Sequence, residues 1–67
     1  MRREAVSSES MREVGYNGGT LEIEFTTGTV YQYFDVPERI YEELMAAGSK
    51  GAFFNAQIRG QFRYARV

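Results

Sequence analysis

The fold is decided at residues 20–26, which read TLEIEFT. Three apolar residues alternate with two glutamates, and this period of two is typical of a β-strand with one face in the core and the other in water. The preceding residues, Tyr16-Asn17-Gly18-Gly19, predict a tight hairpin turn, because Asn and Gly supply the positive φ angles that such turns require. Ser10 to Tyr16 is therefore the expected partner strand.

Thr29 to Phe34 is predicted as the third strand, because its β-branched and aromatic residues suit a pleated surface. Its pairing with residues 20–26 depends on the turn at Thr27-Gly28. If this turn has two residues, Tyr31 and Tyr33 lie beside the glutamates and face away from the core. We favour this register.

The alternative register follows from a three-residue loop, which shifts the pairing by one residue and turns every side chain to the other face. Tyr31 and Tyr33 are then buried, whereas Val30 and Phe34 point to the glutamate side. The favoured register has a cost of its own, because it buries Gln32 and a hydrogen bond has to satisfy that amide. The two registers predict opposite places for the tyrosine pair.

Residues 35–47 are predicted to form the first helix. Asp35 can accept hydrogen bonds from backbone N–H groups at its start, Glu38 follows three residues later, and Pro37 fixes φ within the first turn. Gly48 is the expected C-cap. The apolar stripe of this helix consists of residues at helical spacing, namely Ile40, Tyr41, Leu44 and Met45.

A second helix is expected from about Lys50 to Arg59, with Ser49 as its N-cap and Gly60 at its end. Residues 61–67 alternate apolar with polar residues and predict a short edge strand. The fold class is therefore α+β: a three-stranded antiparallel β-meander followed by a helical hairpin and a short C-terminal edge strand. Residues 1–67 form one domain in this prediction, with residues 1–8 as a flexible arm.

The composition argues against enzymatic chemistry. The 67 residues include no cysteine and no histidine, which excludes disulfides and the common zinc, haem and iron–sulfur ligand sets. Catalysis would fall to carboxylates, lysine, tyrosine or hydroxyl groups. No Ser-x-x-Lys, Gly-x-Ser-x-Gly or Gly-x-x-x-x-Gly-Lys pattern places them in a known frame. We expect a non-catalytic domain that binds no metal and no cofactor.

No stretch of the sequence is long and apolar enough for a membrane span or for the core of a signal peptide. Arg2 and Arg3 are followed by mostly polar residues up to Ser10. The expected compartment is therefore the cytoplasm, without membrane association.

The net charge of −1 hides an asymmetry along the chain. Residues 1–47 carry four cations against nine acids, net −5, whereas residues 48–67 carry four cations and no acid, net +4. Aromatic residues are interleaved with these four cations, as on surfaces that hold phosphates while stacking bases. A sequence pI of about 5.3 predicts binding that is weak and salt-sensitive. In the alternative interpretation the arginines are the solvated side of the edge strand or pair with Glu22 and Glu24.

Two candidate sites follow from these patterns. Ser49-Lys50-Gly51 stands at a helix N-terminus, where free N–H groups attract anions. Its alternative role is a corner between helices, in which Ser49 is a cap and Gly51 fits tightly. Tyr31 and Tyr33 resemble a stacking platform, or else an ordinary cross-strand aromatic pair. The candidate nucleic-acid-binding residues are four cations and three tyrosines: Lys50, Arg59, Arg63, Arg66, Tyr31, Tyr33 and Tyr64.

Several short motifs keep the order and spacing of one known domain. They are Gly15-Tyr16-Asn17, Tyr31-Gln32-Tyr33, Val36-Pro37, Leu44 followed by Ala47, Ser49-Lys50-Gly51, Phe54-Asn55, Ile58-Arg59 and Tyr64. Together they resemble the KTSC domain over about residues 7–66. Members of that family stand at the C-terminus of some lysyl-tRNA synthetases or occur as small bacterial proteins. The resemblance implies a domain without an established activity, for which RNA binding has been suggested.

Two hypotheses therefore remain. In the first, the chain is an accessory module that binds RNA weakly, either tRNA or single strands. In the second, it is a protein-interaction or homo-oligomerisation module without nucleic-acid contact. Ten aromatic residues and the opposite charges of the two segments support the second hypothesis.

Overall fold

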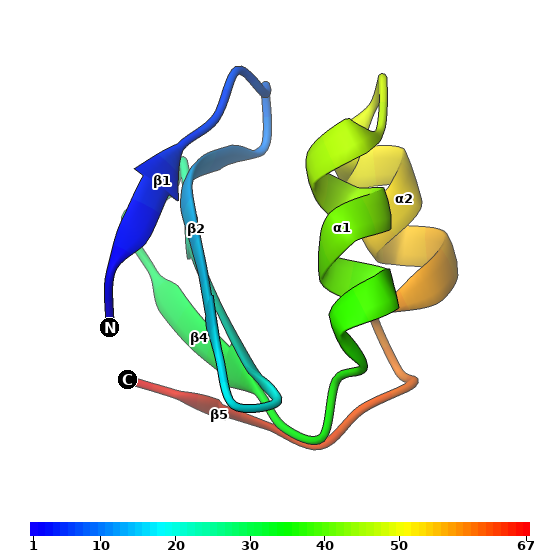
Figure 1. The fold of residues 1–67 in the computed structure, drawn as a ribbon. Coiled ribbons are helices and arrows are strands. Elements are labelled where there is room, and N and C mark those ends of the chain that lie inside the picture. The colour runs from blue at the N-terminus through cyan, green and yellow to red at the C-terminus, as the bar shows by residue number, and fades with distance from the viewer.

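Two layers make up the structure, a computed structural model that describes residues 1–67. An antiparallel sheet of five strands, in the order β1-β2-β3-β4-β5, forms one layer, and two helices cover one of its faces (Figure 1). The elements are β1 (Arg3–Ala5), β2 (Met11–Asn17), β3 (Thr20–Phe25), β4 (Val30–Tyr33), α1 (Glu38–Ala46), α2 (Lys50–Gln57) and β5 (Tyr64–Arg66). The α+β class, the helical hairpin and the C-terminal edge strand are confirmed.

The meander has four strands before the helices, not the expected three. The additional strand, β1, lies within residues 1–8, which were expected to be a flexible arm, and it pairs with β2 so that Arg3 is opposite Gly15. Gly15 permits this approach, because a Cβ there would stand 2.7 Å from the carbonyl oxygen of Arg2. Three residues are too few to display a strand period, so the sequence pattern did not reveal β1.

A β-bulge lies near the start of β2. Met11 pairs with Phe25 and Glu13 with Glu24, so Arg12 is the extra residue. Met11 and the residue three positions later, Val14, are both buried, which a regular strand with period two would not allow. The bulge explains why residues 10–16 lack a clean alternation.

The turn between β2 and β3 is formed by Gly18 and Gly19, whose φ angles are 57° and 88°. Asn17 and Thr20 pair on either side of it. Positive φ at both positions of a two-residue turn is the hairpin geometry that fits the twist of the strands. The predicted turn is confirmed, and the backbone N–H of Val36 donates to Gly19 O at 2.8 Å, which anchors the chain leading to α1.

The favoured register of the second hairpin is wrong. Ile23 pairs with Tyr31, so the loop spans residues 26–28 and has three residues. The N–H of Gly28 donates to Phe25 O at 2.9 Å, and the φ of Gly28 is 92°. A turn followed by a glycine in the left-handed region is a common three-residue hairpin loop. Gly28 thus favours a loop one residue longer than the Thr27-Gly28 pair suggests.

This register turns the tyrosine pair toward the helices. Tyr33 is buried and Tyr31 is half-buried, whereas Val30 and Phe34 point to the other face of the sheet. Gln32 also lies on that other face, where its Nε2 donates to Glu22 Oε1 at 2.8 Å. Burying two large rings is favourable, and no glutamine amide has to enter the core, which gives the physical reason for the alternative register.

α1 begins at Glu38, later than expected. The predicted cap at Asp35 is wrong: Pro37 is the N-cap and no side chain accepts a hydrogen bond there. Pro37 disfavours a helical backbone at the residue before it, so a helix cannot start at Asp35. Asp35 instead has a φ of 58°, and its carboxylate pairs with Arg63.

α2 follows after a short corner. Ser49 is its N-cap as predicted, and its Oγ accepts a hydrogen bond from the N–H of Ala52 at 3.2 Å. The helix ends at Gln57, somewhat before the expected Arg59, and Gly60 adopts a φ of 77° that lets the chain leave toward β5.

The core lies between the sheet and the helices. α1 contributes Ile40 and Leu44 from the predicted stripe, and the other two stripe residues, Tyr41 and Met45, pack at its border. The ten buried hydrophobic residues are Met11, Val14, Leu21, Ile23, Tyr33, Val36, Ile40, Leu44, Phe54 and Ile58. This core fixes the positions of β4 and α2, between which the candidate site opens.

Candidate nucleic-acid interface

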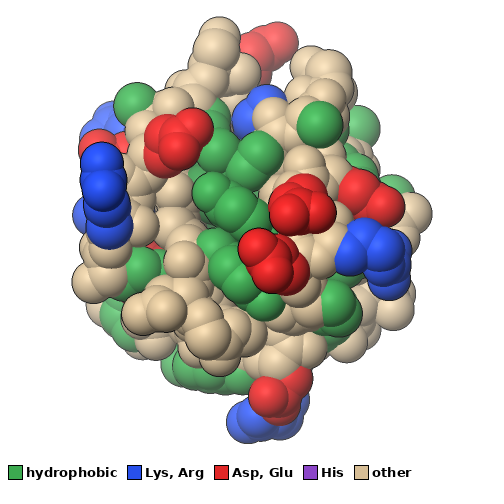
Figure 2. Space-filling view, in the orientation of Figure 1, with side chains coloured by type: hydrophobic (Ala, Val, Ile, Leu, Met, Phe, Trp, Pro, Cys, Tyr) green, Lys and Arg blue, Asp and Glu red, His purple; other side chains and the backbone are tan.

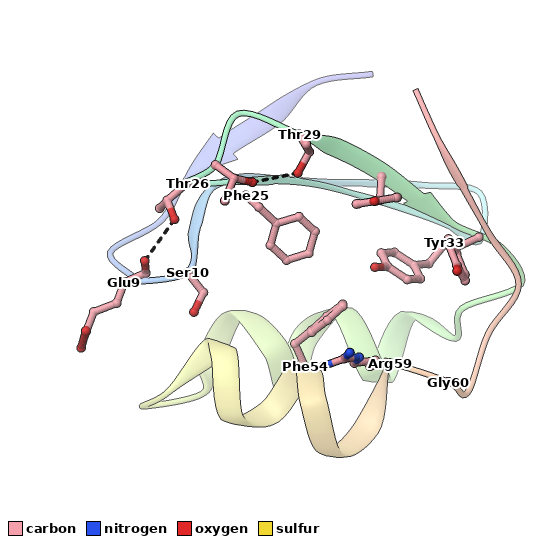
Figure 3. Close-up of a pocket in the computed structure, with 12 residues that line it drawn as sticks. Glu9, Ser10, Phe25, Thr26, Thr29, Tyr33, Phe54, Arg59 and Gly60 are labelled. Carbon is pink, nitrogen blue, oxygen red and sulfur yellow. Dashed lines mark hydrogen bonds between the residues drawn. The ribbon is translucent and has the colours of Figure 1, made fainter.

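A groove opens on the helix-covered face of the sheet, between β4 and β5 on one side and the end of α2 on the other. It encloses about 730 Å³. The rings of Phe25, Tyr33 and Phe54 are turned into this space, with Thr26 at the hairpin end and Gly60 at the opposite end (Figure 3). Segments that are far apart in the sequence therefore meet in one concavity.

Five aromatic residues in contact line the groove: Phe25, Tyr31, Tyr33, Phe54 and Tyr64. The centroid of the Tyr33 ring lies 5.5 Å from that of Phe54 and 5.8 Å from that of Tyr64. The ring of Phe25 meets those of Tyr31 and Phe54 edge to face. These are the preferred geometries of aromatic pairs, so the cluster is a packed wall.

The three tyrosines of this wall differ in exposure. Tyr64 is 63% exposed, Tyr31 is half-buried and Tyr33 is 6% exposed. Because its ring is packed against Phe54 and Tyr64, Tyr33 offers its hydroxyl to the groove and no free ring face. Tyr64 is the member with an open face for stacking.

None of the hydroxyl groups of Tyr31, Tyr33 and Tyr64 forms a hydrogen bond within the chain. By contrast, the hydroxyl of Tyr16 donates to Val36 O at 2.5 Å. Burial, and then the neighbouring Tyr31 and Tyr64, raises the pKa of Tyr33 from 10.0 to about 12, and Arg59 acts in the opposite direction. The Tyr33 hydroxyl therefore stays protonated at neutral pH and can donate a hydrogen bond into the groove.

Two of the predicted cations belong to this face. Arg59 lines the groove just beyond the end of α2 (Figure 3). Arg66 lies opposite Tyr31 on the neighbouring strand, so its side chain stands on the same face of the sheet as that of Tyr31. Arg59 and Arg66 are both exposed and neither forms an ion pair. Their charges are therefore available to an anion at the groove.

The other two predicted cations are engaged elsewhere. Arg63 pairs with Asp35 through a 2.8 Å contact between Nη2 and Oδ2, and its guanidinium lies over the ring of Phe34. The ammonium group of Lys50 donates to Ala47 O at 3.2 Å, at the far end of α2. The structure therefore does not bring all four cations together.

The corner at Ser49-Lys50-Gly51 faces a polar depression that the loop Ser7–Ser10 closes from the other side. Gly51 is packed closely there, since a Cβ on it would stand 2.7 Å from Ser10 Oγ. The Ser49 hydroxyl is occupied by its cap and the Lys50 ammonium by Ala47. These contacts fit the interpretation as a corner, and the anion site stays a prediction.

The sheet glutamates are neutralised by cations from the first half of the chain. Arg3 Nε lies 3.2 Å from Glu13 Oε1 and 3.5 Å from Glu22 Oε2, and its Nη1 lies 3.6 Å from Glu24 Oε1. Arg12 also contacts Glu24, at 3.7 Å. The alternative pairing of the C-terminal arginines with Glu22 and Glu24 is therefore wrong.

The acidic excess of the first 47 residues lies partly over α1. Figure 2 shows acidic side chains gathered over this helix, where Glu42 and Glu43 are exposed. Arg39 offsets part of that charge through a 3.6 Å contact with Glu43. The charge asymmetry of the sequence thus becomes an asymmetry between α1 and the groove.

Two residues of the groove wall were not among the predicted site residues. Phe25 was expected in the core, and Phe54 was expected only as one of the aromatic residues interleaved with the C-terminal cations, yet both line the groove. No local pattern joined Phe54 to Arg59, because residues five apart lie about 140° apart around a helix and Arg59 stands beyond the end of α2. No helix is long and apolar enough to cross a membrane, and no group of three potential metal-ligating side chains occurs.

Comparisons with known proteins place this geometry in a wider group. The model of the KTSC domain family matches residues 7–62. A lysine–tRNA ligase of Nostoc sp. is 48% identical over 48 residues, which are 72% of this chain and 9% of the ligase. A protein of Stutzerimonas stutzeri is 39% identical over 70 residues, covering 100% of this chain and 99% of its own length. The crystal structure of a KTSC domain protein from Yersinia pestis superposes with a TM-score of 0.94 at 40% identity, covering 98% and 96% of the two chains.

Proposed function

The chain belongs to the KTSC domain family, and on that premise we propose that it is a non-catalytic accessory module that binds RNA weakly through the face carrying the groove. Arg59 and Arg66 would contact phosphates, and Tyr64 would stack on a base, with Tyr31 and Tyr33 behind it. Lys50 and Arg63 are assigned to the margin of this interface, because both already have partners within the chain.

One observation carries the proposal: two unpaired arginines share a face with an exposed tyrosine. Arg66 and Tyr64 stand on the same side of β5, and Arg59 faces them across the groove. Arginines that hold phosphates next to an aromatic ring are a common design of single-strand binding surfaces. Arg3, Arg12 and Arg39, by contrast, each have a carboxylate partner within the chain.

The relatives give this proposal its class of ligand. The Nostoc relative is named as a ligase that joins lysine to tRNA, and the chain spans 9% of its length. The tRNA-handling activity of that enzyme belongs to the whole ligase, so tRNA enters here as a candidate partner only. A cytoplasmic location follows from the same proposal.

Titration of the isotope-labelled protein with tRNA and with short single strands tests the proposal by NMR. At low salt we expect shifts at Tyr64, Arg59 and Arg66, with an affinity that falls as salt rises because counterions are released from the RNA. Each phosphate contact adds about 0.7 to the slope of log K against log salt for a single strand. Arg66→Gln should therefore reduce that slope by about this amount.

Arg39→Gln is the matched control, since Arg39 is also an exposed arginine but lies on the acidic helix α1. It should leave the affinity and the salt slope nearly unchanged. If RNA causes no shifts at low salt, or if Arg39→Gln weakens binding as much as Arg66→Gln does, the proposal fails.

Self-association is the second candidate, and one observation favours it. Tyr64 of the edge strand β5 and Val67 just after it are 63% and 64% exposed, and the outer side of β5 is free to pair with another strand. Small-angle scattering across a concentration series decides the question. A growing particle mass that Tyr64→Lys abolishes would support a dimer through β5, and a constant monomer mass would exclude it.

A further inference from the structure

We propose that the groove accepts one unpaired nucleotide of a single strand, with its base stacked on Tyr64 and its phosphate held at Arg59. The inference rests on the proposed function and adds to it what the groove takes: a single nucleotide unit, and no part of a duplex.

The size of the groove fits a ligand of this kind. Its volume of about 730 Å³ lies within the range of pockets that hold small organic molecules. One wall is made of sheet residues and the other of Phe54 from α2 and Arg59 just beyond the end of that helix (Figure 3). A base that is paired and stacked within a duplex cannot enter a concavity with two walls, whereas an unpaired base can.

The aromatic wall offers two different kinds of contact. Tyr64 is 63% exposed and can cover the face of a base with its ring. Tyr33 is 6% exposed and packed between Phe54 and Tyr64, so it presents only its hydroxyl group. Stacking is therefore expected at the mouth of the groove, and hydrogen bonding at its base.

Unused hydrogen-bonding capacity points to a polar ligand. The hydroxyl groups of Tyr31 and Tyr33 form no hydrogen bond within the chain, although both rings are in the aromatic cluster. These hydroxyls are open to solvent, since Arg3 Nη1 is the one buried side-chain polar atom without a partner. Three tyrosines and Arg59 thus line one space. A nucleotide has oxygen and nitrogen acceptors on its base, sugar and phosphate that can use these donors.

The charge in the groove has one sign. Arg59 has no carboxylate partner, and the carboxylate of Glu9, the one acidic residue at the groove, points away from the space (Figure 3). Arg66 adds a second cation beside Tyr31. A ligand with an aromatic ring and an anionic group complements this arrangement, and an uncharged aromatic molecule would leave Arg59 without a partner.

The test compares adenosine 5′-monophosphate, adenosine, inorganic phosphate, a short single-stranded RNA and a blunt-ended RNA duplex without unpaired nucleotides. We expect the monophosphate and the single strand to shift the ring signals of Tyr31, Tyr33, Phe54 and Tyr64. Adenosine and phosphate alone should bind at least about tenfold more weakly, because each satisfies only one of the two contacts.

Three variants assign the contacts. Tyr64→Leu should weaken the monophosphate about tenfold through lost stacking, and Arg59→Gln should weaken the monophosphate without changing the binding of adenosine. Tyr33→Phe keeps the packed ring and removes only the hydroxyl, so it tests the hydrogen bond in a folded protein. Tyr41→Leu, which removes a ring that stacks on Tyr16 away from the groove, is the control and should have no effect.

Failure of this inference can be told apart from failure of the proposed function. If the single strand binds but its shifts avoid the groove and survive Tyr64→Leu, or if the blunt-ended duplex binds equally well, the nucleotide site is refuted and RNA binding stands. If only the free monophosphate binds, the strand-bound nucleotide is refuted. If no RNA binds at low salt, both proposals are refuted.

Discussion

Gly15 lies directly opposite Arg3 in the β1–β2 pair, and the hydrogen atom in place of its side chain lets β1 reach the sheet. A Cβ on Gly15 would stand 2.7 Å from Arg2 O and 2.9 Å from Arg3 Cγ, and the first of these atoms is backbone that cannot rotate away. The edge strand therefore depends on the absence of a side chain in its neighbour.

Gly15→Ala should displace β1 and destabilise the protein by about 1–3 kcal/mol, the usual cost of forcing an extra carbon into a packed site. Urea denaturation gives the free energy of unfolding, and amide exchange at residues 3–5 reports whether β1 has detached. Gly48→Ala is the control, since a Cβ there meets nothing within 4 Å. Equal effects of both substitutions would contradict this role of Gly15.

Arg3→Ala should reverse the salt dependence of stability. Arg3 lies among Glu13, Glu22 and Glu24, and without it these carboxylates repel one another across the sheet. Added salt screens repulsion as well as attraction, so it should stabilise the variant and weaken the ion pairs of the wild type. Thermal unfolding at low and at high salt checks the sign. A variant that salt destabilises as it does the wild type would refute the idea.

Asp35 pairs with Arg63, but its backbone conformation should matter more than its charge. Both side chains are largely exposed, and exposed ion pairs contribute about 0–1 kcal/mol. A φ of 58° costs most residues about 1–2 kcal/mol and costs glycine almost nothing. We therefore expect Asp35→Gly to be neutral or stabilising and Asp35→Ala to be destabilising, as measured by urea denaturation. Similar destabilisation by both substitutions, which both remove the carboxylate, would show that the ion pair dominates.

Tyr33 should make stability fall at alkaline pH. Its pKa is about 12 in the folded protein and 10.0 in the unfolded chain, so between these values the unfolded chain loses the proton that the folded protein keeps. The stabilising contribution is complete below pH 10 and is lost as the pH rises through 12. Urea denaturation below pH 10 and between pH 10 and 12 should show a smaller loss in Tyr33→Phe than in the wild type. Tyr64→Phe, which removes an exposed hydroxyl, is the control, and equal losses in all three proteins would contradict the assignment.

Elements with a strong sequence period were predictable, and those that depend on a single extra residue were not. The alternation of residues 20–26 and the helical stripe around Ile40 and Leu44 each predicted their element correctly, because burial repeats along several positions. The extra residue Arg12 and the three-residue loop ending at Gly28 each shift a pattern by one position. Such a shift changes the face of a whole strand without changing the composition of the sequence.

The same reasoning applies to the candidate site. The concentration of cations after residue 47 was visible in the sequence, but Arg63 found a partner in Asp35 and Lys50 in Ala47, which only the folded chain reveals. Tyr31 and Tyr33 were recognised as a pair but assigned to the wrong face, because the register decides that face. Their contact with Phe25 and Phe54 depends on how α2 lies on the sheet, and no local pattern encodes that position.

β5 has three residues, and the whole helical hairpin separates it from β4, its partner. The earlier strand pairs are joined by short loops, so closing β5 requires the longest connection in the sheet and the greatest loss of chain entropy, for only three paired positions. We therefore expect β5 to open locally while the rest of the fold persists. Since Tyr64 and Arg66 leave with β5, the groove would form and disappear on the timescale of that opening. Ligand binding should therefore slow amide exchange more in β5 than anywhere else in the chain.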